Sequence, residues 1–266
     1  MEANIKTLSC WLEENKLSLH LGKTESILFG GKRKINKMSK LSIMCNDVKI
    51  DSKTEVKYLG NVLDQHLSGD ATCSNTVKRI NGCLKFFYRK KCLFGFKEKK
   101  MLCSTMLQPL FDYACISWFN GLTKTHKKHL QVCQNKILRF MFCLNPRSRI
   151  DCNIFSKVNW LDVQGRVDFL TLNMMYKIYH KTAPQYMCYL EPTRHGYSTR
   201  NNVMTFKVPD VKSSGRNYFV FNGIRLWNSL PNSIRSCTSI DSFKSRCKRF
   251  LFSNMRIREH SDFLFY

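Results

Sequence analysis

Acidic residues are scarce in this chain of 266 residues, because 19 Asp and Glu stand against 44 Lys and Arg and leave a formal net charge of +25. No two aspartates are adjacent. A surface with this excess of positive charge attracts polyanions, since their binding releases condensed counterions. The composition therefore favours a nucleic-acid partner over a basic surface that is merely solvated.

Other signals are also absent. The 13 cysteines form no C-x-x-C pair of the kind that structural zinc sites use, so we interpret them as reduced, mostly buried residues of an intracellular protein, in the nucleus or the cytoplasm. The first sixteen residues lack the apolar run of a secretory signal. No Gly-rich phosphate loop or nucleophile elbow suggests a small-molecule substrate.

Long apolar runs are rare too. The longest candidate, 101–123, contains one charged residue, Asp112, but its Gln, Pro and Asn residues would need partners in lipid. We expect a buried helix there and no membrane partner.

The first 65 residues predict a small α+β unit. Apolar spacing indicates a helix over 2–16 with Ile5, Leu8 and Leu12 inward, and 26–29 is typical of a short buried strand. The segment 41–50 predicts a hairpin around Asn46-Asp47, and 56–64 predicts a strand broken by Gly60.

Helical periodicity replaces strand periodicity in 66–145. We expect helices near 74–91, 97–118 (kinked or broken at Pro109) and 125–143. In the first of these, one side is apolar and ends at an inward Phe87, while Lys78, Lys85 and Arg89 share the opposite side. Phe86 and Tyr88 are ambiguous. Between residues 74 and 100 the only acidic residue is Glu98.

A third unit is expected over 146–266, after the Asn-Pro boundary at 144–151. It begins with a helix near 163–181 and continues through a turn-rich loop at 191–202 and a strand-like segment at 203–208. A last amphipathic helix follows. The predicted fold class is therefore α+β, predominantly α-helical.

Several segments together resemble the reverse transcriptases of non-LTR (LINE-type, jockey-like) retrotransposons. They are "LSLHLGKTESILFGG" (17–31), "VKYLGNVLD" (56–64), "INGCLKFFYRK" (80–90), "PLFDYACISWF" (109–119), "LQVCQNKILRF" (130–140) and "LWNSLPNSIRSCTSIDSFKSRCKRFL" (226–251). They appear in the family's order and cover nearly the whole chain. The resemblance implies a partial palm over 1–65, a helical thumb over 66–145 and a post-polymerase helical region.

The resemblance also implies roles for particular residues. Lys23 looks like the family lysine that lies near the incoming triphosphate, although His20 stands where the family usually has asparagine. Tyr58, Leu59 and Gly60 would shape the primer-grip hairpin. The family polymerises with two Mg²⁺ ions held by clustered aspartates, and this chain lacks that cluster, so we expect a catalytically incomplete remnant that binds no cofactor alone.

The remaining candidates are basic. A sequence-independent grip on RNA, DNA or RNA–DNA duplex phosphates is what a thumb implies. The residues expected to contact nucleic acid are Lys78, Arg79, Lys85, Arg89, Lys90, Lys244, Lys248 and Arg249. By contrast, His126, His129 and Cys133 share a helix face but supply only three potential metal ligands, so no metal site is expected.

Three hypotheses stay open at this point. The chain is a reverse-transcriptase remnant, a repurposed nucleic-acid-binding module, or part of an active polymerase whose aspartates come from elsewhere.

Overall fold

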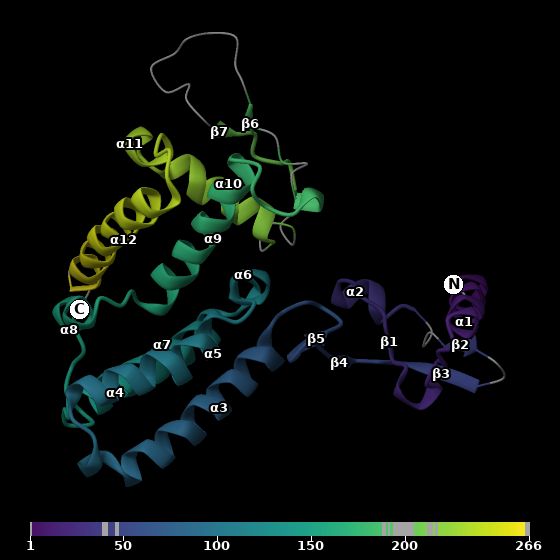
Figure 1. Cartoon of the computed structure of the whole chain (residues 1–266), viewed down its shortest axis with the longest axis horizontal. Helices are drawn as coiled ribbons and strands as arrows, with labels where there is room; N and C mark the ends of the chain where they lie inside the picture. Colours follow the sequence, from purple (N-terminus) through teal and green to yellow (C-terminus); the bar gives the residue numbers. More distant parts are fainter. Residues whose placement is uncertain are drawn as a thin grey trace. The chain divides into compact units, whose positions relative to one another are not determined.

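The computed structural model describes residues 2–38, 42–45, 48–187, 190, 192–193, 205–211, 215 and 218–263. The chain divides into two compact units, Met1–Thr72 and Cys73–Tyr266. Helices dominate and the strands are short, which confirms the α+β, mainly α-helical expectation (Figure 1). The palm and thumb, and the predicted boundaries at 65 and 145, stay predictions.

The first unit holds most of the strands. Its elements are α1 (Glu2–Glu14), the 3₁₀ turn η1 (Leu21–Lys23), β1 (Ser26–Ile27), α2 (Lys32–Ile35), β2 (Ser42–Cys45), β3 (Val48–Lys53), β4 (Glu55–Tyr58) and β5 (Asn61–Asp64).

The three-stranded sheet has the order β1-β3-β2, with β1 parallel and β2 antiparallel to β3. Ile43 pairs with Ile50, and both are buried together with Cys45, because alternate residues of a strand point to the same face. The expected hairpin is confirmed by the pairing of Cys45 with Val48. Its turn residues Asn46 and Asp47 lie outside the described residues.

The segment 56–64 is a second hairpin: the strand is broken at Leu59-Gly60, as the break predicted at Gly60 indicates, and its two halves pair with each other. β4 and β5 pair antiparallel, with Tyr58 opposite Asn61. Leu59 (φ 46°) and Gly60 (φ 85°) both have positive φ, which is what a two-residue hairpin turn requires. Glycine adopts this conformation freely and leucine does so at a steric cost.

Two burial predictions for this unit fail. In α1, Ser9 is buried while Leu8 is 48% exposed, because the small sheet covers only the narrow side of the helix that carries Ile5, Ser9 and Leu12. β1 is only two residues long, and Phe29 beyond it is 46% exposed, since β1 pairs with a single strand at the sheet edge.

The second unit is mostly helical, and α3 (Asp70–Arg89) leads into it. Its further elements are η2 (Lys91–Leu93), α4 (Phe96–Leu102), the π-helical turn η3 (Cys103–Leu107), α5 (Gln108–Asp112), α6 (Cys115–Trp118), η4 (Phe119–Gly121), α7 (Lys124–Met141), α8 (Cys152–Val158), α9 (Val163–Tyr179), η5 (Gln185–Met187), β6 (Pro192–Thr193), β7 (Thr205–Phe206), α10 (Phe219–Ser229), α11 (Asn232–Arg235) and α12 (Ile240–Phe263).

The helix expected over 97–118 is interrupted, but its backbone runs through Pro109 and the break comes only after Asp112. Proline lacks an N–H and its ring collides with the preceding helical turn, and here the π turn η3 precedes it and widens the helix. The helix then ends at Asp112, and Ala114 adopts a left-handed conformation (φ 49°) before α6 begins.

Two hydrophobic clusters hold the second unit. The first joins α3, α7 and the 103–122 segment around Ile80, Leu130 and Ile137, and it includes Phe155 of α8. The second joins α9, α10 and α12 around Trp227 and Phe243. In this part of the chain α9 packs against both α10 and α12 (Figure 1).

Gly223 makes the close approach of α10 to α9 possible. A Cβ atom at this position would lie 2.8 Å from Sδ of Met175, closer than real side chains tolerate. A larger residue there would push the two helices apart.

The region between α9 and α10 is described only in part. Most of the turn-rich loop at 191–202 lies outside the described residues, as does most of the basic segment 212–219. β6 and β7 pair antiparallel, with Pro192 opposite Phe206. Within the part of the chain that the structure describes, no helix combines the length and the hydropathy needed to cross a bilayer.

Candidate nucleic-acid interface

The basic face of α3 lies on the helix side opposite the core. Ile80, Leu84 and Phe87 are buried, as the apolar periodicity predicts. The members of the basic face are all exposed and are Lys78, Arg79, Lys85, Arg89 and Lys90. None of these five side chains has a hydrogen bond or an ion pair with another described residue, so their charges are available to an anion from outside.

Their spacing produces two parallel lines. Lys78, Lys85 and Arg89 are separated by seven and four residues, which returns each to nearly the same angle around an α-helix. Arg79 lies about 100° away on the same side, because a helix turns that far per residue, and Lys90 directly follows Arg89, the last residue of α3. The first line extends for roughly 16 Å along the helix axis at 1.5 Å per residue.

An aromatic side chain lies within this basic face. Phe86 is 60% exposed and stands seven residues after Arg79, so it shares the second line. The adjacent Phe87 is buried and stacks on Phe140 of α7 at 5.9 Å between ring centroids. This resolves the ambiguity left by the sequence, since Phe87 anchors the helix and Phe86 faces solvent.

Gly82 leaves room on the same face. No heavy atom lies within 4 Å of the position that a Cβ would occupy there. The backbone of α3 is therefore accessible between the two basic lines, and a phosphate or a base can approach it closely.

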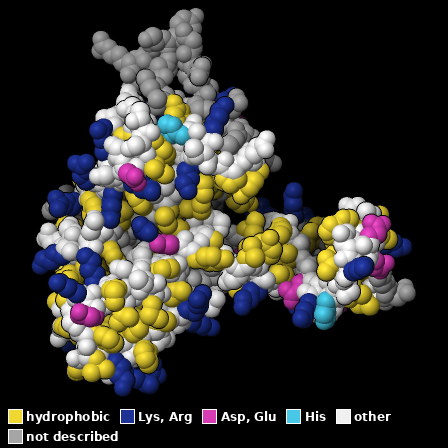
Figure 2. Space-filling model, in the orientation of Figure 1, with side chains coloured by type: hydrophobic (Ala, Val, Ile, Leu, Met, Phe, Trp, Pro, Cys, Tyr) yellow, Lys and Arg dark blue, Asp and Glu magenta, His cyan; other side chains and the backbone are white. Residues whose placement is uncertain are grey.

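Further apolar residues are exposed near the end of α3 and after it. They are Tyr88 in the last turn of α3 and then Leu93, Phe96, Met101 and Met106. Figure 2 shows hydrophobic side chains gathered in patches on the helical unit, bordered by Lys and Arg and by few acidic groups. Aromatic rings among cations are typical of surfaces that bind single strands by stacking and charge.

Asp64 organises the turn that leads into α3. Its carboxylate accepts backbone N–H bonds from Ser68, Gly69 and His66. Burial acts to raise the pKa of Asp64, but these hydrogen bonds outweigh it and the pKa is lowered from 3.8. Thr72 links the start of α3 to β5, because its Oγ1 donates to the carbonyl of Val62 at 2.9 Å.

The predicted basic residues of α12 lie in a different setting. Arg249 is exposed, and Lys244 forms a long ion pair with Asp241 (3.8 Å). Lys248 is half-buried, and burial together with the nearby charges of Arg166 and Lys100 lowers its pKa. That Lys100 and Arg166 lie near Lys248 could not be predicted from the sequence, because nothing local in the sequence indicates a contact between α4, α9 and α12.

Lys23 and the hairpin tip are exposed in the first unit. Lys23 ends η1, and its backbone N–H donates to the carbonyl of His20 at 3.0 Å. Two residues later, Glu25 forms an ion pair with Lys53. Tyr58 and Leu59 at the β4–β5 turn are 60% and 73% exposed.

Metal ligands do not gather in the described part of the chain. No group of three or more His, Cys, Asp or Glu side chains there could hold an ion. The rings of His126 and His129 lie 6.0 Å apart, edge to face, above the buried Cys133. The described residues therefore do not fit the Mg²⁺ pair of a polymerase.

Three buried cysteines have thiols that are hard to ionise. Burial raises the pKa of the Cys103, Cys115 and Cys247 thiols to about 12, so they stay protonated at neutral pH. Most of the described cysteines are buried free thiols, as the sequence led us to expect.

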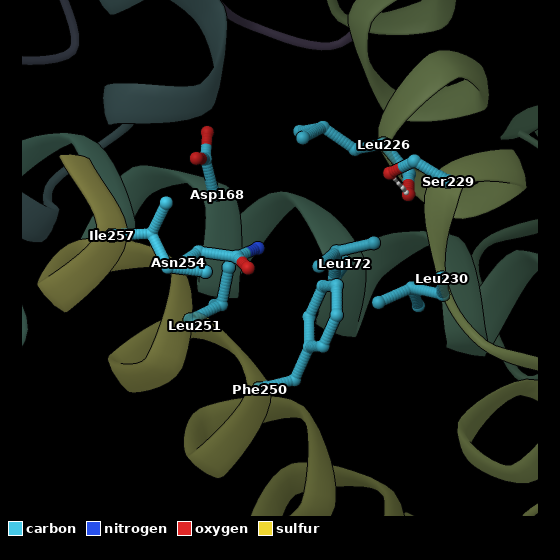
Figure 3. A pocket seen from close by; sticks show the side chains of 9 residues that line it. All are labelled: Asp168, Leu172, Leu226, Ser229, Leu230, Phe250, Leu251, Asn254 and Ile257. Carbon is cyan, nitrogen blue, oxygen red and sulfur yellow. Dashed lines mark hydrogen bonds between the residues drawn. The ribbon is translucent and has the colours of Figure 1, made fainter. Parts of the chain in front are cut away.

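A cavity of about 350 Å³ between α9, α10 and α12 is mainly apolar. Figure 3 shows Leu172, Leu230 and Phe250 around it, with Asp168 and Asn254 at its rim. The hydroxyl of Ser229 donates to the carbonyl of Leu226 at 2.7 Å. Among the described residues that line this cavity there is neither a histidine nor a cysteine.

No family model, no curated protein and no solved structure matches the chain.

Proposed function

We propose that this chain binds nucleic acid without sequence preference, through the basic face of α3. The observation that carries the proposal is the row of Lys78, Lys85 and Arg89, exposed and without an ion pair among the described residues. Holding like charges together on one helix face is unfavourable unless an anion compensates them. A phosphate backbone presents charges at every nucleotide and is the natural complement of such a row.

The row of Lys78, Lys85 and Arg89 is long enough to follow several phosphates of one nucleic-acid strand. Along a duplex axis each strand carries one phosphate per about 3.4 Å, so a line of roughly 16 Å spans about five successive phosphates. Lysine and arginine side chains on phosphates fix position and read no sequence. The expected binding is therefore electrostatic and similar for different sequences.

The test is fluorescence anisotropy with RNA–DNA duplex, DNA duplex and single-stranded RNA, each in two unrelated sequences. We expect affinity to differ little between the sequences and to fall steeply as salt rises. Absence of binding at 50 mM salt, or binding that salt does not weaken, would contradict the proposal.

The resemblance to non-LTR reverse transcriptases supports a finer proposal. The nucleic acid would be the template–primer duplex, gripped by a thumb-like region of a remnant that does not polymerise alone. No step of phosphoryl transfer is assigned to this chain, because its described residues do not fit the metal pair. A repurposed binding module uses the same surface.

Primer extension separates the remnant and the binding module from a working polymerase. Purified protein with primer-template, deoxynucleotides and Mg²⁺ should add no nucleotides. Template-dependent incorporation above a no-protein control would favour the third hypothesis, in which the catalytic carboxylates are supplied from elsewhere.

A further inference from the structure

Two adjoining cavities lie on the second unit beside α12. One, of about 290 Å³, lies between the α4–η3 segment, the 158–161 segment and α12, and is lined by Lys100, Ser104, Trp160 and Lys248 among others. The second, of about 410 Å³, shares Asn159 and Lys248 with it. Here the first is called the Lys100–Lys248 cavity.

Positive charge in this cavity is only partly compensated. Arg166 lines the wall and has its own partner, because its Nε and Nη2 donate to the two carboxylate oxygens of Asp112 at 2.9 and 2.7 Å. Lys100 and Lys248 have no carboxylate within ion-pair distance among the described residues. Among the described residues, no acidic side chain lines either of the two cavities.

This arrangement is unfavourable without an anion. Lys248 is partly desolvated and close enough to Lys100 and Arg166 for their charges, after burial, to lower its pKa. An anion between the lysines would replace their repulsion with attraction, and this attraction is stronger in a site of reduced dielectric than in water.

Polar side chains that can donate hydrogen bonds lie beside the two lysines in the cavity wall. The side chains of Ser104 and Asn159 line the cavity and have no hydrogen bond with another described residue. Gln108 is engaged, since its Nε2 donates to Asp112 at 3.1 Å. Two ammonium groups, a hydroxyl and a side-chain amide together supply the donors that phosphate oxygens accept.

We propose that the Lys100–Lys248 cavity binds a phosphate group of a nucleic-acid strand. This inference rests on the proposed nucleic-acid-binding function and adds a second contact to it. The cavity volume is near the lower end of ligand pockets, roughly 300 Å³, which admits one phosphate with its sugar and excludes a duplex. The phosphate is either a backbone diester or the monoester at a strand end.

The double variant Lys100→Gln with Lys248→Gln tests the site. Its matched control is Lys97→Gln with Arg256→Gln, which removes the same charge from exposed positions of the same two helices. The single variant Lys100→Gln is measured as well, because Lys100 is partly exposed and its replacement disturbs the fold less than that of both lysines. Inorganic phosphate is titrated into each protein by isothermal calorimetry.

We expect the affinity for phosphate to fall about tenfold for each lysine removed, the size of one hydrogen bond to a charged group. The control should stay within about twofold of wild type. Equal phosphate binding by wild type, double variant and control overturns the proposal.

Two strands of one sequence, with a 5′-phosphate or a 5′-hydroxyl, then identify the source. Tighter binding of the phosphorylated strand, lost in the double variant, assigns the site to a strand end. Equal weakening of both strands assigns it to the backbone. Inorganic phosphate tests the cavity alone. If the wild-type protein binds inorganic phosphate but no duplex, the proposed role of α3 is refuted, while the proposed phosphate site in the cavity is not.

Discussion

The salt dependence of duplex binding should decrease by a calculable amount when the basic face of α3 is neutralised. If each of its five cations meets one phosphate, the logarithm of affinity falls with the logarithm of salt at a slope of about −4.5. Raising the salt from 50 to 200 mM then weakens wild-type binding about 500-fold.

The variant Lys78→Gln, Lys85→Gln, Arg89→Gln retains only Arg79 and Lys90 on this face. Its slope should be about −1.8, and the same rise in salt should cost it only about 12-fold. The three positions are exposed and glutamine is nearly as good a helix former as lysine or arginine. Circular dichroism should therefore show an unchanged fold.

A matched control removes Lys157, Lys177 and Lys207, each to Gln. These are exposed lysines outside α3 and make the same change in net charge. The assay is fluorescence anisotropy with an RNA–DNA duplex over a series of salt concentrations. If the control and the α3 variant show the same slope, binding follows net charge alone and the assignment to α3 is wrong.

Three further outcomes can be measured. In titrations followed by anisotropy, Phe86→Ala should weaken single-strand binding by about 1–3 kcal/mol through lost stacking. The aliphatic control Leu93→Ala, at a site that is even more exposed, should leave this binding unchanged. Asp112→Ala leaves Arg166 without its partner and should lower the free energy of unfolding by about 2 kcal/mol in urea, while Asp241→Ala, in a surface pair, should change it by less than about 0.5 kcal/mol. The pKa of Asp64 is lower in the folded protein, so the stabilisation that its carboxylate provides is present above the unfolded value of 3.8 and is lost as the pH falls through the folded pKa. Amide exchange in the 66–69 turn, corrected for intrinsic exchange, should therefore accelerate in acid. A corrected rate that does not depend on pH would contradict this.

Helix positions were predictable because they depend on local signals. The helices expected at 125–143 and 163–181 are α7 and α9, and side-chain caps mark where they begin. Thr123 accepts from the N–H of His126, and Asp162 accepts from that of Gly165. Apolar spacing supplied the rest, since one face of each helix had to be buried.

Strand details were less predictable, because they depend on partners. Whether Phe29 is buried depends on what covers the sheet edge, and whether 56–64 is one strand or two depends on the φ angle that Leu59 adopts. Propensity alone argues against leucine at positive φ. The pairing of Tyr58 with Asn61 overrides that preference.

The two proposed nucleic-acid contacts also differ in whether local sequence signals predict them. The basic face of α3 could be predicted from the sequence, because helical periodicity alone places Lys78, Lys85 and Arg89 on one side. The cavity could not, since Lys100, Arg166 and Lys248 come from three helices and meet only when the second unit folds.

The two contacts should also respond differently to salt. Cations on the basic face are exposed, so ions within a Debye length of about 8 Å at physiological ionic strength screen them. Lys248 is half-buried beside Arg166 and Lys100, and partly buried charges are screened much less. A strand that uses both would lose its α3 contacts first as salt rises and keep the cavity contact. Binding should then level off at high salt in wild type, and this residual affinity should disappear in the Lys100→Gln, Lys248→Gln variant.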